Sequence, residues 1–256
     1  MTRKPLHIAL FAFLHGTMLM SILFMLSSSS YENDLFRRIV KDNTTKEMSD
    51  REKAIELLHV SHQLVKPRER LISKPRNFIL KKKFINSADM HLQEAWGHCG
   101  SHSMVLARLL LSAGYQARIG QMQCGGEWNC HVFVEVKLDH NWVVLDGLAN
   151  TYFTHKTGQM ATFNEVSSNW DYFKSQVSES YASRYKFDGV RYTNWEKIPV
   201  VMPTIKLALS MVGVDVENFS LRVYFLNMYR IYAIALSILY AFLTIITGLW
   251  LWKTKK

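Results

Sequence analysis

The stretch Gly97-His98-Cys99-Gly100-Ser101-His102 decides the fold, because it places a cysteine directly before an apolar run with helical spacing. The apolar positions of that run are Met104, Val105, Leu109 and Leu110. Gly114 follows, and glycine suits the left-handed conformation that ends many helices. The sequence therefore predicts a helix that begins at or near Cys99. The free N–H groups and the dipole of a helix start favour a thiolate, so we expect a nucleophile here rather than an inert buried thiol.

The segment after this helix predicts an antiparallel sheet. Residues 117–123 form one expected strand, and residues 131–138 alternate with a period of two, as a half-buried strand does. A short turn near residues 139–141 leads into a further strand over residues 142–146. The helix followed by these strands indicates an α+β domain.

His131 and Asp146 fall close together if the expected hairpin pairs Leu138 with Asn141. His131 is then the diagonal neighbour of Asp146 on one sheet face, roughly 7–8 Å away between backbones, which an imidazole and a carboxylate can bridge. With Cys99 they make a triad of nucleophile, general base and acid, and orienting carboxylate. Taken singly, His131 is more typical of a structural histidine, and Asp146 of a residue that ends a strand.

Residues 90–150 resemble the transglutaminase-like superfamily in their order and spacing. The resemblance is carried by Gly97-x-Cys99, Gly114, Arg118, His131 on a strand, and Asp146 after Trp142. The resemblance implies a papain-like thiol-enzyme core, in which a helix-borne cysteine packs on an antiparallel sheet that carries the histidine and the aspartate. It implies that Cys99 is the nucleophile, His131 the base and Asp146 the orienter. Such chemistry requires no metal and no organic cofactor.

The chain departs from the family pattern at two places. Gly147 stands where many relatives have proline, and Cys130 and Val132 flank His131 in place of the commoner small and aromatic residues. Neither change removes a catalytic atom, but both leave the geometry of Asp146 open.

Acyl transfer also needs hydrogen-bond donors for the oxyanion that develops on the attacked carbonyl. The backbone N–H of Cys99 is one candidate, and the side-chain amide of Gln93, six residues earlier, is another. Trp96 is a candidate wall of the acyl pocket, with a packed aromatic as the equal alternative. His98 and His102 are expected to be neighbours of the site rather than second bases.

Cys124 and Cys130 bracket five residues, a spacing that a disulfide can close in an oxidising compartment. Cys99 would then be the odd, free thiol. A zinc site made of Cys124, Cys130 and His131 is the alternative, but it lacks a second paired motif.

The apolar residues are concentrated at the two ends of the 256-residue chain. Leu6–Leu26 and Ile231–Trp252 contain no Asp, Glu, Lys or Arg, and each is long enough to cross a bilayer as a helix. The first segment also fits a cleavable signal peptide. Basic residues outside both segments indicate cytoplasmic ends by the positive-inside rule.

The net charge of +10 does not indicate a general binder of nucleic acid. Eight basic residues lie between Lys66 and Lys83, and the rest of residues 27–230 is slightly acidic. That strip is expected to be a solvated loop, with anionic headgroups or an acidic substrate as the alternative.

Two flanking regions carry local signals. Residues 31–65 are expected to be helical, with a capping box at Ser49 and Glu52. Residues 150–195 are rich in aromatic side chains, which indicate a core and covering loops, or else a groove for peptide or glycan.

We therefore expect basic cytoplasmic tails at 1–5 and 253–256, an anchor or signal peptide at 6–26, an exported domain at 27–223 and a transmembrane helix at 224–252. The expected activity is cleavage or transfer of an acyl group from an amide in a peptide, protein or related substrate at a lipid bilayer, without nucleic acid. The alternatives are a cross-linking transamidase and a non-catalytic binding or accessory membrane protein.

Overall fold

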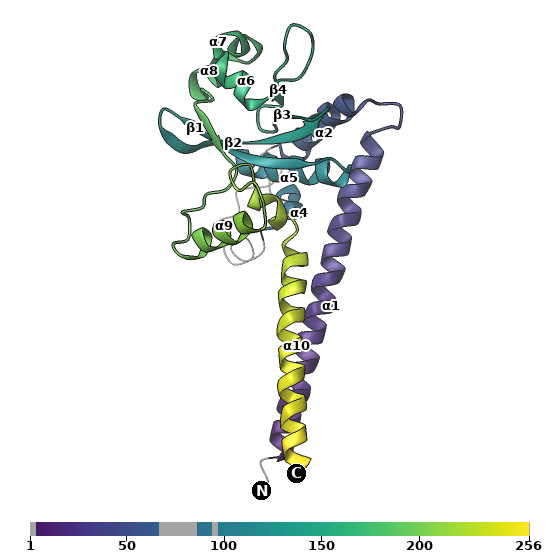
Figure 1. Ribbon diagram of the computed structural model, residues 1–256. Coiled ribbons are helices and arrows are strands. Elements are labelled where there is room, and N and C mark those ends of the chain that lie inside the picture. The colour runs from purple at the N-terminus through teal and green to yellow at the C-terminus, as the bar shows by residue number, and fades with distance from the viewer. Residues whose placement is uncertain (1–3, 67–85, 94–96, 256) are drawn as a thin grey trace. The chain divides into compact units, whose positions relative to one another are not determined.

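The computed structural model describes residues 4–66, 86–93 and 97–255, and the chain forms two compact units. One unit combines the two ends of the chain, Met1–Asp34 and Asn227–Lys256, and the other is the segment between them, Leu35–Leu226. A domain of mixed helices and antiparallel sheet is thus inserted in the sequence between two terminal helices (Figure 1).

The terminal unit contains α10 (Met228–Lys255) and most of α1 (Lys4–Asn43), which are two long apolar helices. Early residues of α1 contact late residues of α10, in the pairs Phe11 with Trp250 and His15 with Thr247. Farther along α1, Ser29 contacts Asn227, which directly precedes α10. The two helices therefore run antiparallel. Most of their large apolar side chains are exposed, unlike those of a core helix in a soluble domain. Both helices are long and apolar enough to cross a membrane.

The first helix is longer than the sequence predicted. A span was expected to end at residue 26 and a separate helical segment to begin at residue 31, whereas α1 continues through Ser27–Ser30 to Asn43. Serine is a tolerated helix former, and neither proline nor glycine interrupts residues 17–43.

The capping box expected for the next helix is confirmed. Ser49 caps α2 (Asp50–Val65): its hydroxyl accepts the N–H of Glu52, and the Glu52 carboxylate accepts the N–H of Ser49.

The domain contains a five-stranded antiparallel sheet with the order β4-β3-β2-β1-β5. Its strands are β1 (Ala117–Cys124), β2 (Glu127–Leu138), β3 (Asn141–Asp146), β4 (Thr151–Tyr152) and β5 (Gly189–Arg191). The expected hairpin is confirmed, since Leu138 pairs with Asn141 and Val134 with Leu145. Continued by one step, this register places Phe133 opposite Asp146, so His131 lies diagonally across from Asp146.

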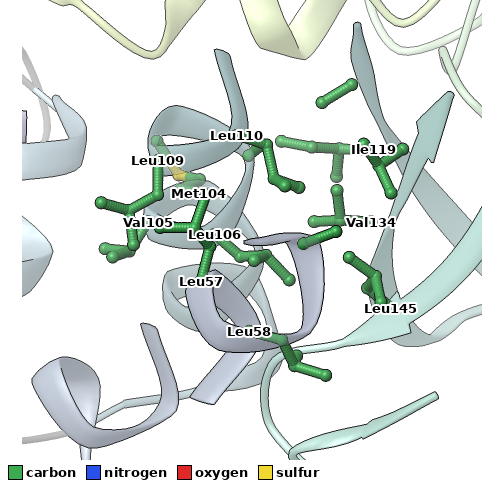
Figure 2. Close-up of a cluster of buried hydrophobic side chains, with 14 of the residues drawn as sticks. Leu57, Leu58, Met104, Val105, Leu106, Leu109, Leu110, Ile119, Val134 and Leu145 are labelled. Carbon is green, nitrogen blue, oxygen red and sulfur yellow. The ribbon is translucent and has the colours of Figure 1, made fainter. Parts of the chain in front are cut away.

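A helical layer covers one face of the sheet. It contains α2, α4 (Ala88–Gln93) and α5 (Cys99–Ser112), which begins and ends where the sequence predicted. Gly114 follows α5 with a φ of 92°, the left-handed conformation expected for it. Side chains of α2, α5, β1, β2 and β3 form the buried cluster shown in Figure 2, with Leu57, Leu58, Leu106, Leu110, Ile119, Val134 and Leu145 among its members.

The other face of the sheet is covered by the aromatic segment that follows β4. This segment forms α6 (Phe163–Ser168), α7 (Trp170–Phe173), the 3-10 helix η1 (Lys174–Gln176) and α8 (Glu179–Arg184) (Figure 1). Its aromatic side chains make a second buried cluster with the sheet, including Phe133, Phe153, Phe163, Phe173, Tyr181, Tyr185 and Phe187. After β5 come α9 (Val201–Met211) and the 3-10 helix η2 (Leu221–Phe225). The expected α+β class is confirmed.

Candidate active site

Cys99 is the first residue of α5, and its side chain is half-buried. The N-cap residue, His98, makes no side-chain capping hydrogen bond, and the first turn contains no acidic side chain. The first N–H groups of a helix have no partner within the helix, so they remain available to a negative charge at this position. The residues at the start of α5 thus provide no side-chain acceptor for the first N–H groups of the helix, which lie beside the sulfur.

Gly97 allows the chain to enter α5 close to α2. A methyl group at this position would lie 2.7 Å from Nε2 of His102 and would also collide with the carbonyl oxygen of Val65, the last residue of α2. No rotation of a side chain relieves a clash with backbone. The close approach therefore requires glycine shortly before the turn that carries Cys99.

The structure brings His131 and Asp146 together in the interior, where both are fully buried. Nε2 of His131 lies 2.5 Å from Oδ2 of Asp146. Burial raises the pKa of the Asp146 carboxyl, but the interaction with His131 and further donors outweigh burial and hold that pKa below its usual range. An ionised carboxylate in this place fixes the orientation of the imidazole and favours its protonated form.

Three other donors complete the environment of Asp146. The Tyr181 hydroxyl donates to Oδ2 at 2.8 Å, and the N–H groups of Leu148 and Ala149 donate to Oδ1 at 3.1 Å each. The loop after β3 turns back on Asp146 to supply the two N–H groups. Every side of this carboxylate is thus paired, as a buried charge requires.

Nδ1 of His131 is the ring nitrogen that Asp146 leaves free. It is buried and makes no hydrogen bond of good geometry with the part of the chain that the structure describes. Burial lowers the pKa of His131, but Asp146 and then Cys99 act more strongly together and raise it to about 9. An imidazole with this pKa is protonated at neutral pH.

The sulfur of Cys99 interacts with the same ring. Burial raises the pKa of the Cys99 thiol, whereas His131 lowers it, as do the backbone N–H groups of Val132 and Gly100. The balance is a pKa below the ordinary value. Because the pKa of His131 is raised and that of Cys99 is lowered, the pair favours thiolate with imidazolium over thiol with neutral imidazole.

Two tyrosines, Tyr181 of α8 and Tyr185 at its C-cap, line the site, and the sequence did not single them out. Tyr181 bonds Asp146, and the ring of Tyr185 stacks on His131 with the centroids 4.1 Å apart. The signal was an aromatic pair at the i, i+4 spacing, which places both side chains on one helix face. That spacing shows a shared face but does not show what the face contacts.

His102 lies near the triad as a neutral neighbour. Burial, then the adjacent His62, lowers its pKa to about 4, so it carries no charge at neutral pH. Its ring stacks on that of His62 with the centroids 5.5 Å apart, and a methyl group on Gly147 would lie 3.2 Å from its Cβ. The small residue after Asp146 therefore lets the β3 loop approach the first turn of α5.

The structure places the remaining candidates as follows. Gln93 is exposed at the end of α4, and residues 94–96, which include Trp96, lie outside the described residues. The oxyanion role of Gln93 and the pocket role of Trp96 therefore stay predictions.

Cys124 and Cys130 form a disulfide across the β1–β2 turn, and Cys99 is a free thiol. Disulfide sulfurs are not thiolate ligands, so the alternative zinc site is not compatible with this arrangement.

The comparisons with known proteins agree with this geometry. Residues 37–147, which include α2, α5 and the strands that bear His131 and Asp146, match the transglutaminase-like superfamily. No curated protein and no solved structure matches the chain. The part of the chain flanked by the two apolar helices therefore contains a transglutaminase-like domain.

Proposed function

We propose that the chain is a thiol enzyme that cleaves an amide, or transfers its acyl group, through a thioester on Cys99. One observation carries the proposal: a half-buried sulfur at an uncapped helix start interacts with a buried imidazole that is held by a fully paired carboxylate. Each part has a distinct task in acyl transfer, and a purely structural cysteine needs none of them.

The first half of the reaction forms the thioester. The thiolate of Cys99 attacks the carbonyl carbon of the amide, a C–S bond forms, and the carbonyl electrons move onto oxygen. The N–H groups at the start of α5, with the Gln93 amide as a further candidate, stabilise that oxyanion. The imidazolium of His131 then donates its Nδ1 proton to the leaving nitrogen as the C–N bond breaks.

The second half releases the acyl group. Neutral His131 takes a proton from an incoming water, whose oxygen attacks the thioester carbonyl, and the thiolate leaves as the C–S bond breaks. An incoming amine in place of water would give transamidation. We favour water, and therefore a peptidase or amidase, because nothing in the sequence signals a channel that excludes water from the site.

We propose further that the domain lies on the non-cytoplasmic side of a membrane crossed by α1 and α10. The disulfide between Cys124 and Cys130 supports an oxidising compartment. The exposed apolar surfaces of two antiparallel helices support a pair of spans. Peptides, proteins or other amides that reach the outer face of the bilayer would be its substrates.

The test is alkylation of Cys99 by iodoacetamide in the purified full-length protein. Cys99 is its free thiol, so the reaction reports on one sulfur while the disulfide is kept oxidised. We expect faster labelling of wild type near neutral pH than of free cysteine, and a loss of at least about tenfold in His131→Ala. The Cys99→Ala variant should remain folded and unlabelled.

Two results would contradict the proposal. If wild-type Cys99 reacts no faster than free cysteine, the domain is a non-catalytic binding or accessory module. If Cys99→Ala unfolds, the cysteine has a structural role. Analysis of the products from a peptide library, with and without an added amine, would separate hydrolysis from transamidation.

A further inference from the structure

Arg222 is a half-buried cation in the 3-10 helix η2, a segment far from the triad in sequence. The residue at its N-cap, Ser220, is buried and joins this segment to β1: its hydroxyl accepts the N–H of Ile119 at 3.0 Å and donates to the carbonyl of Ile119 at 3.2 Å. The N–H of Leu221 is held by the Thr193 hydroxyl at 2.9 Å. The backbone that carries Arg222 is therefore fixed against the sheet.

The same short helix packs against β1 and against α5, the helix that begins at Cys99. Val223, next to Arg222, and Cys99 pack on the same buried hydrophobic cluster. The charge of the Cys99 sulfur also acts on the guanidinium: burial lowers the pKa of Arg222, Cys99 raises it, and the neighbouring Arg191 lowers it. The short helix that carries Arg222 thus packs against the helix that begins at Cys99.

Arg222 makes no hydrogen bond or ion pair with the described part of the chain. Arg118, another arginine of the domain, provides a contrast, because its guanidinium has the partners that a structural role requires. It bonds Glu135 at 2.6 Å and Asn218 at 2.9 Å, and it stacks on Tyr192. Apart from the Cys99 sulfur, the described residues offer no negative charge to this half-buried cation, and a structural role does not explain the free-energy cost of that arrangement.

Arg191 adds a second positive charge beside Arg222 without supplying a counter-ion. Its Nε donates to the neutral amide of Gln121 at 3.0 Å, and its guanidinium stacks on Trp128. Gln121 lies opposite Val132, whose backbone N–H contacts the Cys99 sulfur. Arg191 is therefore linked through Gln121 to the strand position that contacts the sulfur, and its charge acts on Arg222.

We propose that Arg222, with Arg191 beside it, forms an anion subsite next to Cys99 that binds a carboxylate carried by the substrate close to the scissile amide. The inference rests on the proposed thiol chemistry and narrows its substrate class. A carboxylate is the anion that peptides supply, through an acidic side chain or a terminal α-carboxyl, and the planar guanidinium matches its two oxygens.

The test compares two alkylating reagents of nearly equal size, iodoacetate and iodoacetamide, which differ by one negative charge next to the reacting carbon. Both react at Cys99 in the full-length protein, so the ratio of their rate constants measures attraction of a carboxylate to this site. We expect Arg222→Gln to lower the iodoacetate rate about tenfold while it changes the iodoacetamide rate less than about twofold. Arg222→Lys should retain part of the preference, because it keeps the charge and loses the planar fork.

Arg51→Gln is the matched control, since it removes the same charge from an exposed position on α2. We expect it to leave both rates unchanged. A measurement on wild type alone does not depend on folding of a variant: added acetate should slow iodoacetamide labelling, whereas the same concentration of acetamide should not.

An unchanged ratio in Arg222→Gln, or acetate no more protective than acetamide, would overturn the inference. An equal loss with both reagents would also overturn it, because Arg222 would then act on the thiolate itself. Failure of the proposed function looks different: wild-type Cys99 would be slow with iodoacetamide, whatever the ratio of the two reagents.

Discussion

At the scale of single residues, Asp146 decides what the triad can do. A fully buried carboxylate that accepts hydrogen bonds from a histidine, a tyrosine and two backbone N–H groups stays ionised where an unpaired one would take a proton. The same charge raises the pKa of His131, and His131 in turn lowers the pKa of the Cys99 thiol. The pKa of the half-buried Cys99 thiol thus depends on hydrogen bonds in the interior.

The bond from Tyr181 to Asp146 provides a first prediction. Tyr181→Phe removes one donor from a buried charge, so we expect the free energy of unfolding to fall by about 1.5–3 kcal/mol, measured by urea denaturation. Tyr185→Phe is the matched control on the same helix face, because the Tyr185 hydroxyl has no hydrogen bond with the described residues, and its ring contact remains. It should change that free energy by less than about 0.5 kcal/mol. Equal losses in the two variants would show that the Tyr181 bond does not stabilise Asp146.

The two pKa shifts provide a second prediction, on pH. As pH falls through the lowered pKa of Cys99, the thiolate takes a proton, so the rate of alkylation should fall with a midpoint below that of a free thiol, about 8.5. As pH rises through about 9, His131 loses the proton that the leaving amine needs. Substrate turnover should therefore decline above that pH while alkylation, which needs only the thiolate, does not. A midpoint at or above that of free cysteine would contradict the assignment.

At the scale of elements, the site forms where α5, the β2–β3 hairpin and α8 meet. The start of α5 brings the sulfur, the hairpin brings the histidine and the aspartate, and α8 covers the pair with Tyr181 and Tyr185. The first two elements follow local rules: the glycine after α5 ends the helix, and the short turn sets the strand register. Hence local rules were sufficient to place His131 near Asp146 and Cys99 at a helix start, while the packing of that helix on the sheet was expected from the family resemblance.

The contacts of α8 and η2 follow no such rule. Tyr181 meets Asp146 across 35 residues of chain, and Arg222 is more than a hundred residues from Cys99. An aromatic pair or a single arginine in a sequence shows neither which face of the sheet it will cover nor which charges it will meet. The end of the first helix was missed for a different reason, since Ser27–Ser30 favours a boundary in composition but does not prevent a helix.

The entry of the chain into α5 provides a third prediction. Gly97→Ala adds a methyl group that meets the Val65 carbonyl and the His102 ring, so we expect a loss of about 1–3 kcal/mol in stability and slower alkylation of Cys99. Gly100→Ala is the control, because a methyl group there meets nothing within 4 Å and lies inside the helix. That substitution should be neutral or stabilise the protein by up to about 1 kcal/mol. Equal behaviour of the two variants would mean that the close approach at Gly97 does not position the sulfur.

At the scale of the whole molecule, the order of the units along the chain constrains its topology. The apolar parts of the two helices belong to one unit and run antiparallel, and the transglutaminase-like domain lies between them in the sequence. If both helices cross a bilayer, the two chain ends lie on one side and the domain lies on the other. The lysines that follow the second span favour the cytoplasm for the ends, and the disulfide favours an oxidising compartment for the domain.

This topology provides a fourth prediction, which membrane-impermeant maleimide tests on intact cells. In a Cys99→Ala background, which removes the native free thiol, a cysteine introduced by Arg51→Cys on the exposed surface of α2 should be labelled without permeabilisation. A cysteine introduced by Lys256→Cys in the basic tail should be labelled only after the membrane is opened. The reverse pattern would place the domain in the cytoplasm, and labelling of both sites in intact cells would show that the chain ends do not lie across the membrane from the domain. Because neither position takes part in the triad, the result holds whether or not Cys99 proves to be a nucleophile.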